Sequence, residues 1–273
     1  MLHAATNTRS SHSAIVAARA NRSPIARAAG ATAAICVALT LFVTLAAPAG
    51  AETATSETTA AIRASFSPDR LGAKAAFTFT VHYSGGEFGA PSPVRRAVVH
   101  LPPGLQMHIP TLRDCTRAHL QAHGASGCPA RSQIGSGRAI ADVHAGSELE
   151  HEEATVWAFI GPLQGSNPTI EILGQGYSPL EERIVITGVV LPDRAPYGEK
   201  LVMSIPPIPT IPLEPDASTV SFTLTIGGMR FQAHNPNTVV VPSRCPAGGF
   251  PFAADFTYAD GSTSTTTTTA PCP

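Results

Sequence analysis

The chain has 273 residues, of which 43% are hydrophobic and only 14% are charged, and its 18 basic residues nearly balance 19 acidic ones. A typical soluble domain has roughly 25% charged residues. This composition, without any run of basic residues, excludes a nucleic-acid binder, a coiled coil and a disordered acidic tail. It names no activity.

The first 51 residues have the pattern of a secretory signal peptide. Residues 1–27 contain four arginines and no acid, and the uncharged stretch 28–51 includes the apolar run AAICVALTLFVTLAA. Pro48 ends this run, and the small residues at 49–51 are typical of a cleavage site. We therefore predict an exported protein that begins at Glu52, secreted or associated with the cell envelope. The alternative is an uncleaved anchor, because 24 uncharged residues could span a bilayer that needs ~20.

The remaining 222 residues carry a formal charge of −5 and an even number of cysteines: Cys115, Cys128, Cys245 and Cys272. In an exported chain, four cysteines favour two disulfides over free thiols.

Beyond the leader, residues 52–61 (ETATSETTAA) are small and polar, and we expect a short flexible segment there. Residues 75–83 alternate Phe77, Phe79 and Val81 with polar residues, which is the period of a half-buried strand. Similar β-branched or aromatic runs, closed by turn residues, follow at 94–101, 137–145, 153–160, 168–173, 183–191, 200–205, 218–226, 237–241 and 252–258. We predict an all-β, Ig-like β-sandwich of about ten strands that forms a single domain over residues 62–273.

The helix signal between these strands is short. In residues 111–124 (TLRDCTRAHLQAHG), Thr111 can cap the first turn with Asp114 as the returning acid, and Gly124 is placed to end the helix.

A proline-rich segment, 204–215 (SIPPIPTIPLEP), interrupts the strand pattern with five prolines in twelve residues. Such a segment favours an extended path with few backbone donors. If it were a linker, the 58 residues after it would make a marginal second domain. We therefore predict a long crossover along the sandwich, with its isoleucines partly buried.

The C-terminal tract STSTTTTT (262–269) is low in complexity, which fits a glycosylated stalk or a flexible spacer. We favour a third interpretation, the last strand of a hairpin, because Asp260-Gly261 is a strong turn signal and threonine suits an exposed strand. A two-residue turn would place Ala259 opposite Ser262. Cys245 would then lie about four residues out of register with Cys272, a gap that a loop can close, so we predict that these two cysteines are bonded.

Four potential metal ligands cluster at the predicted helix. Cys115, His119, His123 and Cys128 have the spacing C-x3-H-x3-H-x4-C within fourteen residues, which could close a tetrahedral zinc site. The alternative is a Cys115–Cys128 disulfide that leaves both histidines on the surface. An oxidising compartment favours the disulfide, and we therefore predict no metal and no cofactor.

Two segments resemble those of a known group of proteins. Residues 98–139 contain LPPG, a cysteine and then CP-x-x-S-x-I-G-x-G, and residues 235–273 contain a second Cys-Pro pair that frames a Phe/Tyr hairpin. Both resemble segments of uncharacterised secreted β-rich proteins of GC-rich actinobacteria. The resemblance implies secretion and a β-rich fold, and it brings no activity with it.

Motifs of the common hydrolases are incomplete. The chain lacks G-x-S-x-G, and His151-Glu152 begins the zinc motif H-E-x-x-H but meets Thr155 where the second histidine belongs. We expect the acidic run 148–153 to be a solvated turn. Trp157 alternates with Phe159 in the following strand as if both faced the core.

A glycosidase-like secreted hydrolase is the alternative function, since its two carboxylates can come from anywhere in the sequence. The candidate acids are Glu148, Glu150, Glu171 and Asp142. A single tryptophan gives a poor platform for a sugar. We therefore predict a non-catalytic exported protein with a structural or interaction role at the cell envelope or outside the cell. Its expected partner is an envelope or extracellular protein or a glycan, not a nucleic acid, and a membrane only if the leader is uncleaved.

Overall fold

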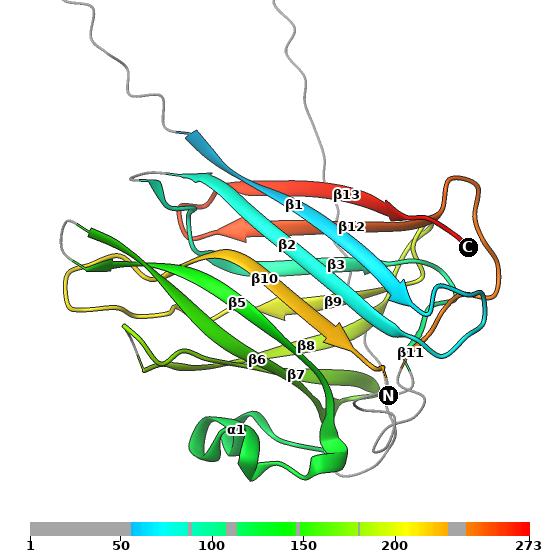
Figure 1. Cartoon of the computed structure of the whole chain (residues 1–273), viewed down its shortest axis with the longest axis horizontal. Helices are drawn as coiled ribbons and strands as arrows, with labels where there is room; N and C mark the ends of the chain where they lie inside the picture. Colours follow the sequence, from blue (N-terminus) through cyan, green and yellow to red (C-terminus); the bar gives the residue numbers. More distant parts are fainter. Residues whose placement is uncertain (1–55, 87–88, 108–113, 146–147, 180, 229–238) are drawn as a thin grey trace, which may run out of the picture. The chain divides into compact units, whose positions relative to one another are not determined.

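The computed structural model describes residues 56–86, 89–107, 114–145, 148–179, 181–228 and 239–273 (Figure 1). They belong to one compact unit, Glu52–Pro273; the predicted leader lies outside the described residues. The strands are β1 (Ser56–Ser67), β2 (Ala76–Gly86), β3 (Val94–Leu101), β4 (Gln106–Met107), β5 (Gln133–Ala145), β6 (Glu148–Gln164), β7 (Asn167–Gln175), β8 (Arg183–Pro192), β9 (Glu199–Ser204), β10 (Ser218–Ile226), β11 (Val239–Val240), β12 (Phe250–Tyr258) and β13 (Thr263–Ala270). One α-helix, α1 (Arg117–His123), and two single-turn helices, η2 (Ala125–Gly127) and η3 (Ala130–Ser132), lie between β4 and β5.

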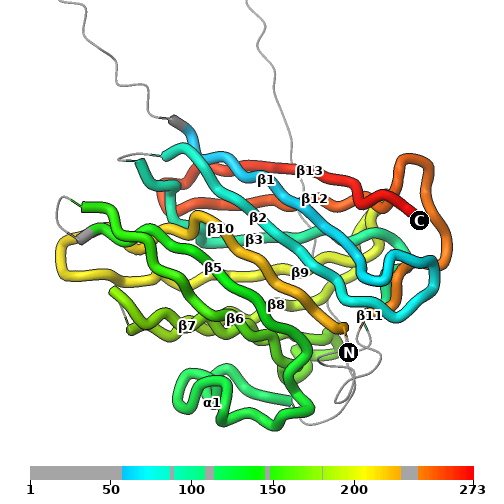
Figure 2. The backbone as a smooth tube through the Cα atoms, in the orientation of Figure 1, coloured from blue at the N-terminus to red at the C-terminus, as the bar shows by residue number. Residues whose placement is uncertain are grey.

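Eleven strands form one antiparallel sheet in the order β1-β2-β10-β5-β6-β7-β8-β9-β3-β12-β13, and β4 pairs with β11 in a small second sheet. The large sheet bends round until its first and last strands, β1 and β13, lie side by side (Figures 1 and 2). The predicted all-β fold, with about ten strands and one short helix in a disulfide-closed loop, is confirmed. Its packed layers are parts of one continuous curved sheet.

Aromatic side chains fill the core where β1 and β2 face β12. The ring of Phe77 stacks on Phe252 with centroids 5.5 Å apart, and Phe66 meets Phe250 edge-on at 5.7 Å. Such offset and edge-on contacts add to the burial of apolar area. This half of the core is therefore densely filled.

The prediction of a flexible segment at 52–61 is wrong for residues 56–61, the part of it that the structure describes. Residues from Ser56 onward belong to β1, which pairs with β2 as far as Ser67. Ile62 and Phe66 are buried in the core. Burial of these two side chains and pairing with β2 stabilise a strand whose other residues are small and polar.

The helix is shorter than predicted. It begins at Arg117, and the side chain of Thr116 accepts a hydrogen bond from the N–H of His119, so Thr116 is the cap in place of Thr111. Asp114 lies before the helix and is exposed, while Thr111 lies outside the described residues. Gly124 ends the helix as predicted, with a φ of 66° and its N–H bonded to the carbonyl of Leu120.

The threonine tract forms the predicted last strand, but the turn before it is wrong by one residue. Thr257 faces Thr263, so the loop has three residues, 259–261, where two were expected. Gly261 has a φ of 85°, which suits the left-handed last position of a three-residue hairpin loop. The predicted disulfide between Cys245 and Cys272 is confirmed, with the Cα atoms 6.0 Å apart.

Two disulfides in one chain indicate an oxidising, non-cytoplasmic compartment. Over the described ranges, no helix has the length and apolar character needed to cross a membrane.

Candidate functional site

The inner faces of three neighbouring strands, β5, β6 and β7, carry very small side chains. These are Ala139, Ala141, Ala154 and Gly174, and together with Gly176, which directly follows β7, they line an apolar cavity of about 190 Å³ inside the curved sheet. An engineered apolar cavity of roughly 150 Å³ is large enough to admit benzene. The small residues thus leave a space of ligand size opposite the aromatic half of the core.

Two glycines on the inner face show where the space is open. A Cβ atom added at Gly174 would meet no heavy atom within 4 Å. A Cβ atom added at Gly188, on the next strand, would lie 2.8 Å from Cδ1 of Leu201. The cavity therefore has unfilled space beside Gly174, whereas the side chain of Leu201 fills the space beside Gly188.

Two acidic side chains, Glu152 and Glu182, also line the cavity. The acidic run 148–153 is part of β6, so the expected solvated turn is wrong. Glu152 is 6% exposed, because position 152 shares the inner face of β6 with Ala154. Glu152 was not among the site residues predicted from the sequence, although its two-residue spacing from Ala154 places both residues on the same face of a strand.

The proline-rich segment between β9 and β10 crosses one end of the cavity. β9 and β10 occupy the eighth and third places in the sheet, so the chain between them must pass from one side to the other. Ile205 and Ile208 line the cavity, whereas Ile211 is 45% exposed. An ion pair between Arg95 and Asp216 fixes this segment to β3.

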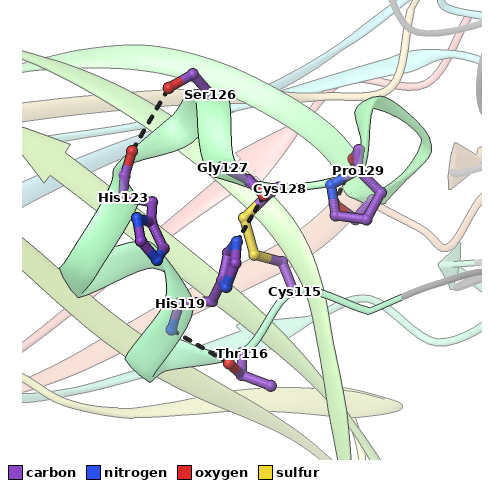
Figure 3. Close-up of a disulfide and its surroundings, with 9 residues drawn as sticks. Cys115, Thr116, His119, His123, Ser126, Gly127, Cys128 and Pro129 are labelled. Carbon is purple, nitrogen blue, oxygen red and sulfur yellow. Dashed lines mark hydrogen bonds between the residues drawn. A yellow bond between two sulfur atoms is a disulfide. The ribbon is translucent and has the colours of Figure 1, made fainter.

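The loop between Cys115 and Cys128 carries α1 and lies against the outer face of β6, β7 and β8 (Figures 1 and 3). The two cysteines are bonded to each other, so the predicted disulfide is confirmed and neither sulfur is a thiolate for zinc. Nε2 of His119 lies 2.6 Å from the carbonyl oxygen of Gly127, and the rings of His119 and His123 are 4.7 Å apart (Figure 3). Both histidines are exposed. In the described part of the chain, no group of three or more His, Cys, Asp or Glu side chains could hold a metal ion.

The four acids considered for a hydrolase do not converge on the cavity. Asp142 is buried beside His151, with Oδ1 2.5 Å from Nδ1. Glu171 is buried on the outer face of β7. Along β6, the partners of these two acids are eight residues apart, which corresponds to about 26 Å. Glu148 and Glu150 are exposed, and none of the four acids lines the cavity.

A second polar cluster lies on the outer face around His100. Nδ1 of His100 is 2.5 Å from Oδ2 of Asp193, and Nε2 is 3.0 Å from Oδ2 of Asp255. Burial alone would raise the pKa of Asp193, but hydrogen bonds from His100 and the Arg194 N–H and the charge of Lys200 outweigh it, so the pKa lies below its ordinary value. Both ring nitrogens of His100 face carboxylates, so the cluster links strands β3 and β12 and the β8–β9 turn.

Comparison with the models of protein families, with curated proteins and with solved structures gave no match.

Proposed function

We propose that this chain is an exported, non-catalytic protein that binds an apolar small molecule inside its curved sheet. The observation that carries the proposal is the apolar cavity of about 190 Å³, open at Gly174. Scaled against a cavity of roughly 150 Å³ that binds the six carbons of benzene, this volume suits a ligand with about eight carbon atoms.

The chemistry of the lining favours binding of an apolar molecule over hydrolysis of a glycan. Among the lining residues, only Tyr83, Glu152, Glu182 and Thr219 have a nitrogen or oxygen atom in their side chains. A sugar needs many hydrogen-bond partners, because each buried hydroxyl left without one costs about 1–3 kcal/mol. An alkyl chain or a small ring system needs none.

Export is part of the proposal and rests on two supports. The basic and then apolar pattern of residues 1–51 is that of a signal peptide, and the two disulfides favour an oxidising compartment. A protein outside the cytoplasm that holds an apolar compound could carry it through water or keep it at the envelope.

The test is binding of 1-alkanols from hexanol to tetradecanol, measured by displacement of the neutral fluorescent probe diphenylhexatriene from the purified protein. We expect one site per chain. Affinity should rise about fourfold per added methylene, since each buried CH₂ contributes about 0.8 kcal/mol, and it should level off once the chain fills the cavity. Binding without saturation, or a rise with no plateau, would refute an internal site.

A further inference from the structure

We propose that residues 208–217 (IPTIPLEPDA), called here the apolar tip, insert into the surface of a lipid bilayer. The protein then takes up and releases its apolar ligand by contact with a membrane. The ligand transfer rests on the proposed function, because the base of the tip is part of the wall of the same cavity.

An exposed leucine in a strained conformation lies in the tip. The exposed fraction of Leu213 is 104%, and that of Ile211 is 45%. The φ of Leu213 is 76°, and among the described residues it is the one non-glycine residue with a positive φ. The left-handed conformation costs such a residue about 1–2 kcal/mol, and a leucine left in water forgoes about 1.5–3 kcal/mol of burial. Strain and exposed apolar surface at one residue indicate a role in binding.

Hydrogen bonds within the tip close it into a turn. The N–H of Ala217 donates to the carbonyl of Ile208 at 2.8 Å, and the N–H of Glu214 donates to the carbonyl of Ile211 at 3.2 Å. Leu213 lies inside the smaller of these two closed loops. The exposed leucine is therefore presented by a turn that its own backbone holds in place.

The backbone of the tip has few donors left to hydrate, which favours lipid as the partner. Pro209, Pro212 and Pro215 have no N–H, and the hydroxyl of Thr210 donates to the carbonyl of Pro215 at 2.7 Å. A donor that leaves water without a partner costs about 1–3 kcal/mol. A tip with few donors can enter the bilayer surface at low cost, whereas a partner that adds a strand would need those donors.

The tip lies at the end of the cavity where β10 begins. Ile208 and Ala217, at its base, both line the cavity. The ladders from β10 through β5 and β6 to β7 are antiparallel, so β7 ends where β10 begins (Figure 1). Tyr177, two residues beyond the end of β7, is 59% exposed. A bilayer that receives the tip is therefore brought to this end of the cavity, where a second exposed apolar ring lies.

The charges at this end predict which lipids the tip prefers. The tip contains no lysine, arginine or histidine. Glu214 directly follows Leu213, Glu181 is exposed in the β7–β8 loop, and Asp216 is paired with Arg95. Basic residues attract a protein to anionic lipids, and acidic residues are repelled by them. We therefore expect contact with a zwitterionic surface that weakens when anionic lipid is added.

The experiment loads the purified protein with diphenylhexatriene and mixes it with phosphatidylcholine vesicles that carry a fluorescence quencher. The rate at which the probe reaches the vesicles should rise with vesicle concentration, because transfer requires contact. Release through water would give a rate that does not depend on vesicle concentration. Replacing half of the phosphatidylcholine by phosphatidylglycerol should lower the rate.

Leu213→Asn removes the apolar side chain and keeps the turn, since asparagine tolerates a positive φ. It should lower the transfer rate by about tenfold, leave probe affinity within about twofold and melt no lower than the parent. Leu163→Asn is the matched control. Leu163 is 65% exposed, and it lies at the far end of β6, a strand that begins at the tip's end of the sheet. The control should change neither the rate nor the affinity.

The outcomes separate this inference from the proposed function. If the rate does not depend on vesicle concentration, or if Leu213→Asn transfers as fast as the parent, the membrane contact is wrong and the apolar site stands. Faster transfer to the anionic vesicles would also overturn it, as would a parent dimer that Leu213→Asn converts to a monomer, since the tip would then bind a second copy. If the probe does not bind with saturation, the proposed function fails. Flotation of the parent and of Leu213→Asn with phosphatidylcholine vesicles, which needs no ligand, then decides whether the tip binds a membrane.

Discussion

Gly174→Ile is the most informative substitution in this chain, because it should remove binding and raise stability at once. Ile170 and Ile172 precede Gly174 on the inner face of β7 and both line the cavity, so a third isoleucine continues the row. A Cβ atom at position 174 meets no heavy atom within 4 Å, and the φ of Gly174 is not in the left-handed region. The new side chain can therefore enter the cavity without a backbone shift.

The expected size of the effect comes from two contributions. A fully buried isoleucine side chain contributes about 1.5–3 kcal/mol, and loss of glycine from a strand interior contributes about 0.5–1 kcal/mol. Some of this gain is lost to the ordering of the new side chain, about 0.5–1 kcal/mol. A net gain of about 1–3 kcal/mol corresponds to a rise in Tm of about 3–9 °C for a domain of this size.

The assay pairs thermal unfolding with decanol binding. Gly174→Ala is the matched control, since it adds one carbon, gains about 0.4–1 kcal/mol through the unfolded chain and leaves most of the space open. We expect Gly174→Ile to melt higher than the parent and to bind decanol at least tenfold more weakly, while Gly174→Ala still binds. A destabilised Gly174→Ile protein, or one that binds decanol as before, would show that the space at Gly174 is not the site.

Three further predictions test other parts of the structure. Burial raises the pKa of Glu171 more than the hydrogen bond from Thr187 and the charge of Arg117 lower it. Glu171→Gln should therefore raise the free energy of unfolding at pH 7, as urea titrations would measure. This gain should shrink as the pH falls toward the ordinary glutamate pKa of about 4.3. The pKa of Asp193 is lowered in the fold, so its ionised carboxylate stabilises the protein above about pH 4 and this stabilisation is lost as the pH falls further. His100→Gln should lower the free energy of unfolding by about 1–3 kcal/mol at pH 7, and the variant should lose less stability than the parent on acidification. An unchanged dependence of the free energy of unfolding on pH would contradict the role of His100. Replacing both Cys245 and Cys272 by alanine should cost on the order of 3 kcal/mol and expose residues 262–273 to protease, as peptide mapping after brief digestion would show.

The strands could be predicted where alternation and turn residues agree. The boundaries of β3 and β10 match the expected 94–101 and 218–226, because each run ends where glycine, proline or a change of periodicity stops the pairing. β1 was missed, since alanine, threonine and serine occupy most of its positions and its stability comes from its neighbours. The helix start was placed too early, because Thr111 and Thr116 are both plausible caps and the sequence does not say which turn packs on the sheet.

The one-residue error at the C-terminal turn has a different cause. Asp-Gly suits a two-residue turn, and it equally suits the end of a three-residue loop with glycine in the left-handed position. The two choices shift the pairing of β12 and β13 by one residue. The disulfide prediction survived this error because the loop between Cys245 and β12 absorbs the difference.

The cavity could not be predicted, because it depends on which face of each strand is inside. Trp157 and Phe159 were expected in the main core, as large side chains usually are. Instead they pack on the outer face of β6, in a cluster with Leu120 of α1 and the disulfide. The loop closed by that disulfide gives these large side chains a second place to be buried. Because these side chains already stabilise β6 from its outer face, the inner face can carry small residues such as Ala154 and the strand still forms. The helix loop therefore buries the large side chains of β6 outside the sheet, and small residues line the cavity on the inner face of the same strand.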